Sequence, residues 1–346
     1  MKMRILIDIL HPAHVHVFRN YIKIMERRGH SVLVTSRDKD VAIKLLEKYK
    51  IKHVTLSKIG KKKIQLIKEL ILRIWRLAKI ARKFRPDVML GVMGATIAPV
   101  GWLLGIPTLV FYGTENARLT NWYVYLLCTK YISPNAYREK LGKKNIRYEG
   151  MHELAYLRPK YFKSNPNILK EAGLKKGENF TIIRLVSWGA SHDIGHKGIS
   201  QNLRIKAVKE FLKYGKVFIS SEKKLPSELD KYRLKVSPEK LHDLIYYATL
   251  VYGESATLAS EASVLGTYSI YLDNEGRGFT DELERKYGLV KNFTESKEDQ
   301  IKSIEYGIEI LKNKNAKKEV KEKTRIMLKK TVDLTELMIN ETDKFK

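Results

Sequence analysis

The chain has 346 residues, of which 44% are hydrophobic, enough for two α/β domains with real cores. Its single cysteine, Cys128, excludes a disulfide framework and a cysteine-based metal site. The 66 Lys and Arg against 38 Asp and Glu give a net charge of +28, which indicates a polyanionic partner, either nucleic acid or anionic lipid. A Lys-rich thermophile surface is the alternative, but it explains so large an imbalance less well.

The chain shows neither a signal-peptide pattern nor a membrane span. Met1 leads directly into a strand-like segment. The longest uncharged run, residues 95–114, contains Pro99, Pro107 and several glycines, which are typical of helix, turn and strand in succession. We therefore expect a cytoplasmic protein, whose contact with a membrane would be peripheral and on the inner face.

Apolar strands alternate with amphipathic helices along the first half of the chain. The pattern predicts strands at 4–9, 31–36, 88–91, 108–112 and 131–133, and helices at 15–28, 40–49, 64–84, 96–104 and 121–128. Gly29 and the sequence Gly105-Ile106-Pro107 end two of these helices.

The second half repeats the alternation after a segment with few core-like residues. Strands are predicted at 180–186, 217–220, 250–252 and 268–272, and helices at 201–214, 238–248, 257–265 and 280–287. The fold class is therefore α/β with two doubly wound domains and a cleft between them, where ligands meet the carboxyl ends of strands. The expected divisions are 1–155, a linker at 156–166, 167–320, and a basic helix at 321–346.

Residues 251–272 carry the most informative pattern, a strand, a tight turn, a helix and a second strand. Gly253 closes the first strand, and Ser255 opens the helix, whose free N–H groups form a ready anion site. Glu261 lies under two turns further on, within reach of a ribose hydroxyl while a phosphate sits at the helix N-terminus. An ordinary N-cap and a surface glutamate are the alternative.

Three histidines, His11, His14 and His16, follow the first predicted strand in the segment 10–18. Histidine is the usual general base near neutral pH, so a group at the mouth of a strand favours a catalytic role for one of them. The alternative is a helix cap or a backbone contact. No cysteine or carboxylate accompanies them at metal-ligand spacing.

Three further loops follow predicted strands. In residues 91–101, Gly94 and Ala95 would let a helix N-terminus approach a ligand, unless they only allow close packing. Glu115 and Arg118 would bind substrate or pair with each other. Residues 186–198 form a small-residue loop suited to cradling phosphate. A metal site of His192, Asp193 and His196 is a weaker interpretation of that loop.

Residues 58–85 hold eleven Lys or Arg and one Glu. We assign the core stripe to Ile64, Ile67, Ile71, Ile74, Ala78 and Ala81, and the opposite face to Lys62, Arg73, Arg76 and Lys83, flanked by Leu66, Leu72 and Trp75. Such a helix suits an anionic membrane surface, with a solvated outer helix as the alternative. Nucleic acid is less favoured, because no reader motif or base-stacking aromatic pattern accompanies the basic run.

Together these motifs resemble the GT-B glycosyltransferase superfamily, in particular the enzyme that adds N-acetylglucosamine to lipid I. The matching positions are His16-Val17-Phe18, Gly91, Gly94, Pro99, Gly101, Leu104-Gly105-Ile106-Pro107, Glu115-Asn116-Ala117, Ser187, Gly189, Ala190, Ser255 and Glu261. The resemblance implies two Rossmann-like domains, the first for an acceptor and the second for a nucleotide-sugar donor. The chain departs from this pattern at His11-Pro12-Ala13, where that enzyme has paired glycines.

Two other families are also similar. Residues 8–16 resemble a mostly archaeal family called domain of unknown function 354, which carries no established reaction. Glu115 resembles the catalytic glutamate of non-hydrolysing UDP-N-acetylglucosamine 2-epimerases, and His192 lies roughly at their catalytic histidine. Their catalytic aspartate falls at Ala95, and without that group an elimination–addition mechanism should fail, so transfer is favoured.

The resemblance implies a metal-independent transfer from a nucleotide-diphosphate sugar, with UDP-sugar as co-substrate and no other cofactor, to an acceptor such as a lipid-linked sugar. His16 is expected as general base, His14 as second choice, and Glu115 as the group that orients acceptor or base. The diphosphate would contact Ser187, Gly189, Ala190, Ser255, Ala256 and Thr257, the ribose Glu261, and the rest of the substrates Gly94, Ala95, Arg118, His192 and Lys197. An epimerase and a non-catalytic basic binding protein are the alternatives.

Overall fold

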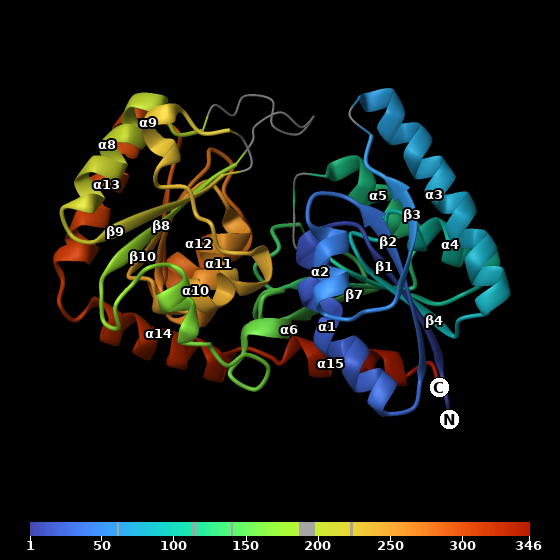
Figure 1. The fold of residues 1–346 in the computed structure, drawn as a ribbon. Helices are drawn as coiled ribbons and strands as arrows, with labels where there is room; N and C mark the ends of the chain where they lie inside the picture. Colours follow the sequence, from blue (N-terminus) through green and yellow to red (C-terminus); the bar gives the residue numbers. More distant parts are fainter. Residues whose placement is uncertain (61, 113–114, 116, 140, 187–197, 222–223) are drawn as a thin grey trace. The chain divides into compact units, whose positions relative to one another are not determined.

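The computed structural model describes residues 1–346 except 61, 113–114, 116, 140, 187–197 and 222–223 (Figure 1). The chain divides into two compact units. Unit 1 is Met1–Tyr156 together with Val332–Lys346, and unit 2 is Leu157–Thr331. Within the described ranges, no helix is long and apolar enough to cross a bilayer.

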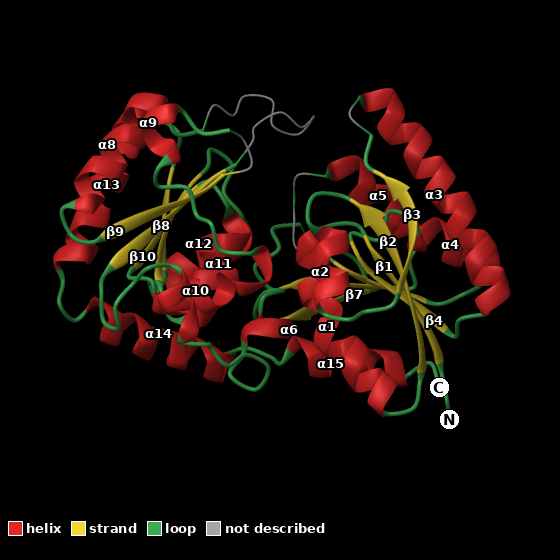
Figure 2. Cartoon of the chain, viewed as in Figure 1, coloured by secondary structure: helices red, strands yellow, loops and turns green. Residues whose placement is uncertain are grey.

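Unit 1 contains a seven-stranded parallel sheet in the order β3-β2-β1-β4-β5-β6-β7. Its strands are β1 (Arg4–Ile9), β2 (Ser31–Asp38), β3 (His53–Lys58), β4 (Val88–Val92), β5 (Thr108–Phe111), β6 (Lys130–Pro134) and β7 (Asn145–Tyr148). Figure 2 draws the strands in yellow and the helices in red. The strand order reverses between β1 and β4, so the loops after these two strands meet at one point of the sheet edge, where doubly wound folds bind ligands.

The helices of unit 1 form two layers, one on each face of the sheet. They are α1 (Pro12–Arg27), α2 (Ala42–Lys48), α3 (Lys63–Phe84), α4 (Ile97–Leu104), α5 (Arg118–Leu127), α6 (Leu154–Leu157) and α15 (Leu334–Asp343). α1 packs against α2 and α15, whereas α4 packs against both α3 and α5. Right-handed crossovers require this division, because the strand order runs one way from β1 to β3 and the other way from β4 to β7.

Unit 2 contains a five-stranded parallel sheet in the order β12-β11-β10-β8-β9. Its strands are β8 (Phe180–Leu185), β9 (Lys216–Ser221), β10 (Leu250–Gly253), β11 (Tyr268–Leu272) and β12 (Val290–Phe293). Its helices are α7 (Asn167–Glu171), α8 (Gln201–Leu212), α9 (Ser227–Asp230), η1 (Pro238–Lys240), α10 (Leu241–Tyr247), α11 (Ala256–Leu265), α12 (Gly278–Glu282), η2 (Leu283–Tyr287), α13 (Lys297–Lys312) and α14 (Ala316–Lys330). The order reverses between β8 and β10, which places a second switch point there.

The predicted fold class, two doubly wound α/β halves, is confirmed. Three strands were not predicted, β3, β7 and β12, and each lies at the edge of its sheet. The single basic helix expected at 321–346 is wrong, because the structure has α14 and α15 there, one in each unit. α1 begins at Pro12 and not at the predicted residue 15, so His14 lies on the helix together with His16.

A buried ion pair holds the carboxyl edge of the unit 1 sheet together. Asp8 lies near the end of β1, and Arg73 Nη2 donates to both of its carboxylate oxygens, at 2.8 Å to Oδ1 and 3.0 Å to Oδ2. Both side chains are almost fully buried. Thr35 and Thr96 also donate their hydroxyls to Asp8. The pair therefore joins β1, β2, α3 and the start of α4.

Glu69, one turn before Arg73, extends this polar network. Its carboxylate accepts from Arg37 Nε at 2.7 Å and from Ser57 Oγ at 2.6 Å. Although burial raises it, these hydrogen bonds hold the pKa of Glu69 below its usual value. Arg73 also donates to Ser57, at 3.3 Å, so the two networks are continuous.

The network contradicts the predicted orientation of the basic helix. Arg73 was assigned to the outer face but is buried, whereas Ile64, Ile67 and Ile71, assigned to the core, are each more than half exposed. Only the later members of that stripe face the core: Ala78 and Ala81 are buried and Ile74 is partly buried. The pairing of Arg73 and Glu69 with the sheet edge sets this orientation, because each needs a buried partner that only that edge supplies.

Arg73→Met should lower the free energy of unfolding by about 3–5 kcal/mol, because it leaves the Asp8 carboxylate buried without its cation. Urea denaturation measures this loss. Arg82→Met, on the exposed side of the same helix, is the matched control and should change stability by less than about 0.5 kcal/mol. Equal losses in the two variants would contradict a structural role for the ion pair.

Candidate functional site

The switch point of unit 2 lies where β8 and β10 end side by side. Gly253, the last residue of β10, pairs with Arg184 and has a φ of +146°. A Cβ at Gly253 would lie 2.0 Å from the Arg184 carbonyl oxygen, so only glycine allows this close approach. The glycine therefore brings the loops after the two strands together.

Glu254 fastens these loops to each other. Its buried carboxylate accepts hydrogen bonds from Val186 N at 2.9 Å and from Ile199 N at 2.7 Å, and Arg204 donates to it at 3.2 Å. Burial raises the pKa of Glu254, against the opposing effect of Arg204. Because Val186 and Ile199 flank the segment 187–198, one side chain fixes both ends of the predicted phosphate-cradling loop.

The start of α11, where the sequence predicts an anion site, is an N-capped helix end. Ser255 is the N-cap, and its Oγ accepts from Leu258 N at 3.3 Å. The hydroxyl proton is still available for donation, and the N–H groups of Ala256 and Thr257 belong to the first turn, which has no intrahelical acceptors. These three groups can donate to a phosphate without displacing any helical bond.

Glu261 is buried on α11 rather than on the surface, so the alternative of a surface glutamate is wrong. Its Oε1 lies 2.8 Å from His242 Nε2 on α10, and both side chains are almost fully buried. This contact fixes the direction of the carboxylate. A role for Glu261 in binding ribose stays a prediction.

Several predicted contacts lie outside the described residues. They are Ser187, Gly189, Ala190, His192 and Lys197, together with the alternative metal ligands Asp193 and His196. In the described parts of the chain, no group of three or more His, Cys, Asp or Glu is placed to hold a metal ion.

In unit 1, the loop after β4 turns sharply into α4. Met93 and Gly94 both have positive φ, +66° and +67°, and a Cβ at Gly94 would lie 2.6 Å from a Val110 methyl carbon. The packing alternative therefore accounts for this glycine. The carbonyl of Ala95 accepts from the Tyr123 hydroxyl at 3.1 Å. Neither contact tests the predicted substrate role of Gly94 and Ala95.

His11 and His14 lie beside a third histidine that the sequence analysis missed. The rings of His11 and His14 are 5.9 Å apart, and His14 Nδ1 accepts from Leu10 N at 3.3 Å. Burial, and then the charges of His11, His152 and Lys39, lower the pKa of His14 well below its usual value. We call His11, His14 and His152 the histidine cluster.

His152 reaches the cluster because the chain after β7 returns to α1. Asn20 donates to the Ala155 carbonyl at 2.9 Å, which anchors this return segment on α1. Burial lowers the pKa of His152 to about 4. Its Nε2 is buried and has no hydrogen-bond partner within the described residues. The only sequence signal was a histidine two residues after Gly150, which follows β7.

His16, the first choice for a general base, has a different environment. Its ring stacks on Tyr156, with centroids 5.3 Å apart, and its Nδ1 lies 3.4 Å from the Tyr49 hydroxyl and 3.5 Å from Arg19. His14 and His16 are two residues apart on α1, so their side chains point to different sides of the helix. The structure thus separates two residues that the sequence treated as one group.

Glu115 is half-buried after β5. Its Oε1 accepts from Arg138 N at 3.4 Å, and its Oε2 is buried without a partner among the described residues. The side chain of Arg118 lies outside the description, so the expected pair with Glu115 is not tested. Glu115 thus keeps one carboxylate oxygen for another group.

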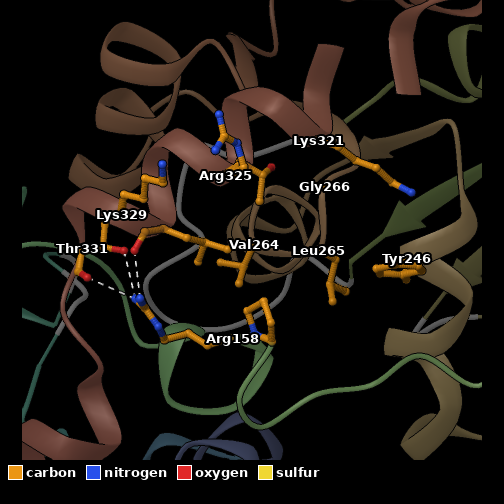
Figure 3. A pocket seen from close by; sticks show the side chains of 12 residues that line it. Arg158, Tyr246, Val264, Leu265, Gly266, Lys321, Arg325, Lys329 and Thr331 are labelled. Carbon is orange, nitrogen blue, oxygen red and sulfur yellow. Dashed lines mark hydrogen bonds between the residues drawn. The ribbon is translucent and has the colours of Figure 1, made fainter. Parts of the chain in front are cut away.

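A cavity of about 580 Å³ lies in unit 2 near the C-terminal end of α11, away from Ser255 (Figure 3). Arg158 donates to the Leu328 carbonyl at 2.8 Å and to the Thr331 carbonyl at 3.1 Å. These bonds satisfy carbonyls at the end of α14, as helix termini require. Arg158, Leu328 and Thr331 all line the cavity, which is not the predicted diphosphate site.

The family model described as "Protein of unknown function (DUF354)" matches residues 3–340. The chain belongs to this family. An uncharacterised protein of Methanocaldococcus jannaschii is 27% identical over 286 residues, covering 78% of this chain and 82% of that protein. The narrower of the sequence resemblances is therefore confirmed.

Solved structures show the same fold at low sequence identity. A UDP complex of Staphylococcus aureus MnaA superimposes with a TM-score of 0.71 at 12% identity, covering 99% of this chain and 96% of that one. The UDP-GlcNAc 2-epimerase of Methanocaldococcus jannaschii has a TM-score of 0.64 at 14% identity, covering 90% of this chain and 94% of that one. The spinosyn rhamnosyltransferase SpnG with thymidine diphosphate has a TM-score of 0.64 at 13% identity, covering 98% of this chain and 100% of that one. The fold is thus GT-B-like and is shared with nucleotide-sugar enzymes of two reaction types.

The stability of the chain should fall as pH drops from 6.5 towards 4, because His152 is neutral in the folded state and protonated in the unfolded chain over that range. His152→Asn should remove about 2 kcal/mol of this pH dependence. Urea denaturation at neutral pH and near pH 4.5 measures it. His53→Asn is the control. If the free energy of unfolding of His152→Asn changed with pH as much as that of the wild type, His152 would not be a neutral buried histidine in the folded state.

Proposed function

We propose that the chain is a glycosyltransferase that moves a sugar from a nucleotide-diphosphate donor, in the first instance a UDP-sugar, to an acceptor hydroxyl. The observation that carries this proposal is the carboxyl edge of unit 2. There the N-terminus of α11 lies at a switch point, beside a loop whose two ends are tied by Glu254. The likeness to solved structures that hold UDP and thymidine diphosphate supports the same ligand class.

The donor half of the mechanism follows from charge development on the leaving diphosphate. The N–H groups of Ala256 and Thr257 and the Ser255 hydroxyl would stabilise that charge as the glycosidic bond to phosphate breaks. The predicted partners Ser187, Gly189 and Ala190 would complete the cradle. Glu261 would accept hydrogen bonds from ribose hydroxyls, with His242 orienting its carboxylate.

The acceptor half requires a neutral base that can accept the hydroxyl proton. We assign this role to His152 in place of His16, because its Nε2 is buried without a partner among the described residues, whereas His16 is packed between Tyr156 and Tyr49. His14 accepts from Leu10 at Nδ1, so its neutral form carries the proton on Nε2 and is suited to donate. Glu115 would orient the acceptor.

Epimerisation of a UDP-sugar is the second candidate, because UDP-GlcNAc 2-epimerases share the fold. Ala95 argues against this reaction, because the resemblance aligns it with the catalytic aspartate of those enzymes. Alanine offers only backbone groups at that position. Incubation with UDP-sugar and no acceptor separates the two reactions. An epimerase interconverts the sugars and releases no UDP, whereas a transferase releases UDP only when an acceptor or water takes the sugar.

Glu261→Gln should weaken UDP binding about tenfold to a hundredfold, because it removes a charged acceptor for the ribose hydroxyls. Isothermal titration with UDP and with 2′,3′-dideoxy-UDP gives the sharpest measurement. The wild type should prefer UDP, and Glu261→Gln should bind both alike.

The control for this experiment is Glu298→Gln, an exposed glutamate on α13, which should leave both affinities unchanged. Continued preference for UDP in Glu261→Gln would show that the carboxylate does not contact ribose. No binding of UDP, GDP, CMP or ADP to the wild type would contradict the proposed donor site itself.

His152→Asn should lower the rate of UDP release from a UDP-sugar about 10²- to 10⁴-fold and leave the dissociation constant of UDP within about twofold. His16→Phe keeps a ring for stacking on Tyr156 and should retain most of the rate. The reverse ranking, with His16→Phe inactive and His152→Asn active, would return the role of general base to His16.

A further inference from the structure

The outer helix layer of unit 1 exposes an unusual amount of apolar surface. On α3, the side chains of Ile64, Ile67, Ile71 and Trp75 are more than half exposed, and that of Leu72 is also exposed. They follow a helical spacing of three and four residues, so they form one stripe along the outward side. Scattered apolar side chains are normal on a surface, but a continuous stripe marks a contact site.

The neighbouring helices continue this surface. Trp102 and Leu103 are exposed on α4, and Leu119, Trp122 and Leu126 are exposed on α5. α4 packs against both α3 and α5, so the three helices form one layer. Of the fourteen large apolar side chains exposed within the described residues, ten belong to this layer. We call these ten side chains the outer apolar surface.

Tryptophan and positive charge distinguish this surface from an ordinary protein interface. The exposed fractions of Trp75, Trp102 and Trp122 are 54%, 67% and 66%, and these are three of the four tryptophans of the chain. Tryptophan concentrates at the boundary between lipid headgroups and acyl chains, where its ring is apolar and its N–H remains hydrated.

The exposed charged side chains that the structure describes on α3, α4 and α5 have one sign. Lys68, Lys79, Arg82 and Lys83 are exposed on α3, and Lys79 Nζ lies 3.8 Å from the centre of the Trp75 ring. The three helices contain one acidic residue, Glu69, and it is buried in the network with Arg37. An exposed face with apolar anchors, cations and no carboxylate is complementary to an anionic bilayer surface.

We propose that unit 1 docks on an anionic lipid bilayer through the outer apolar surface, with the side chains of Trp75, Trp102 and Trp122 inserted at the headgroup level. The buried pairing of Arg73 and Glu69 maintains this face, because it holds these two side chains inward and leaves Ile64, Ile67 and Ile71 outward. The docking rests on observations separate from the proposed sugar transfer. If both hold, the acceptor is presented at a membrane.

Flotation with vesicles of phosphatidylcholine alone, or with about 30% phosphatidylglycerol, tests the proposal. The wild type should float with the anionic vesicles. The triple variant Ile67→Gln, Ile71→Gln, Trp75→Gln should lose at least about a hundredfold in partition coefficient. The matched control is Leu212→Gln with Ile326→Gln, two exposed apolar residues of unit 2, which should float like the wild type.

A charge variant separates lipid attraction from general stickiness. Lys68→Gln, Lys79→Gln, Lys83→Gln should weaken binding to anionic vesicles by about fivefold per lysine and leave binding to neutral vesicles unchanged. Its control removes the same charge from exposed lysines of unit 2, Lys312→Gln, Lys314→Gln, Lys318→Gln, and should change the partition by less than about threefold.

Tryptophan fluorescence locates the contact even if a multiple variant folds poorly. In a Trp188→Phe background, brominated lipids should quench the emission of Trp75, Trp102 and Trp122 on vesicle binding. Two results would overturn the proposal: no flotation of the wild type with anionic vesicles, or equal flotation of the triple apolar variant of α3 and its unit 2 control. The proposal would also be overturned if the wild type bound no vesicles but formed a dimer that the triple apolar variant could not form. UDP affinity of the triple apolar variant and of the charge variant of α3 should not change, so failure of docking and failure of donor binding are distinguishable.

Discussion

The structure of unit 1 depends on the buried ion pair between Asp8 and Arg73. One guanidinium ties β1 to α3, and the hydroxyls of Thr35 and Thr96 complete the carboxylate's partners. A buried charge is tolerated only when it is paired and hydrogen-bonded, so the pair fixes both the rotation of α3 and the start of α4. The same rotation places Ile64, Ile67 and Ile71 outward. A constraint at the sheet edge thus determines what the opposite side of the helix exposes.

Unit 2 has its own organising carboxylate. Glu254 is buried at the carboxyl end of β10 and holds Val186 and Ile199 by their backbone N–H groups. The next residue, Ser255, caps α11. Two neighbouring residues of one turn therefore set both the loop ends and the helix N-terminus. Such a pre-organised group of donors is what the proposed stabilisation of a leaving diphosphate requires. The two units thus use the same device, a buried carboxylate at a switch point, with a cation in one and backbone amides as the main partners in the other.

Much of the fold could be predicted from the sequence, because buried parallel strands are continuous apolar runs and glycines end several helices. The strands missed, β3, β7 and β12, are edge strands that contain polar residues, so they leave no such run. The length of α3 was predicted nearly to the residue, but its orientation was wrong, because periodicity alone does not show that an arginine has a buried partner. Ser255 was found through its capping pattern. His152 was missed because its place in the cluster depends on the return of the chain to α1.

The proposed function depends on the binding of a nucleotide diphosphate at the β8–β10 edge of unit 2. Hydrogen–deuterium exchange with and without UDP-sugar tests it most directly, because the first-turn amides of α11 have no intrahelical acceptors and should exchange quickly in the free protein. We expect the ligand to slow exchange at Ala256 and Thr257 and at the loop ends Val186 and Ile199. Protection confined to other segments of the chain, or none at saturating ligand, would contradict it.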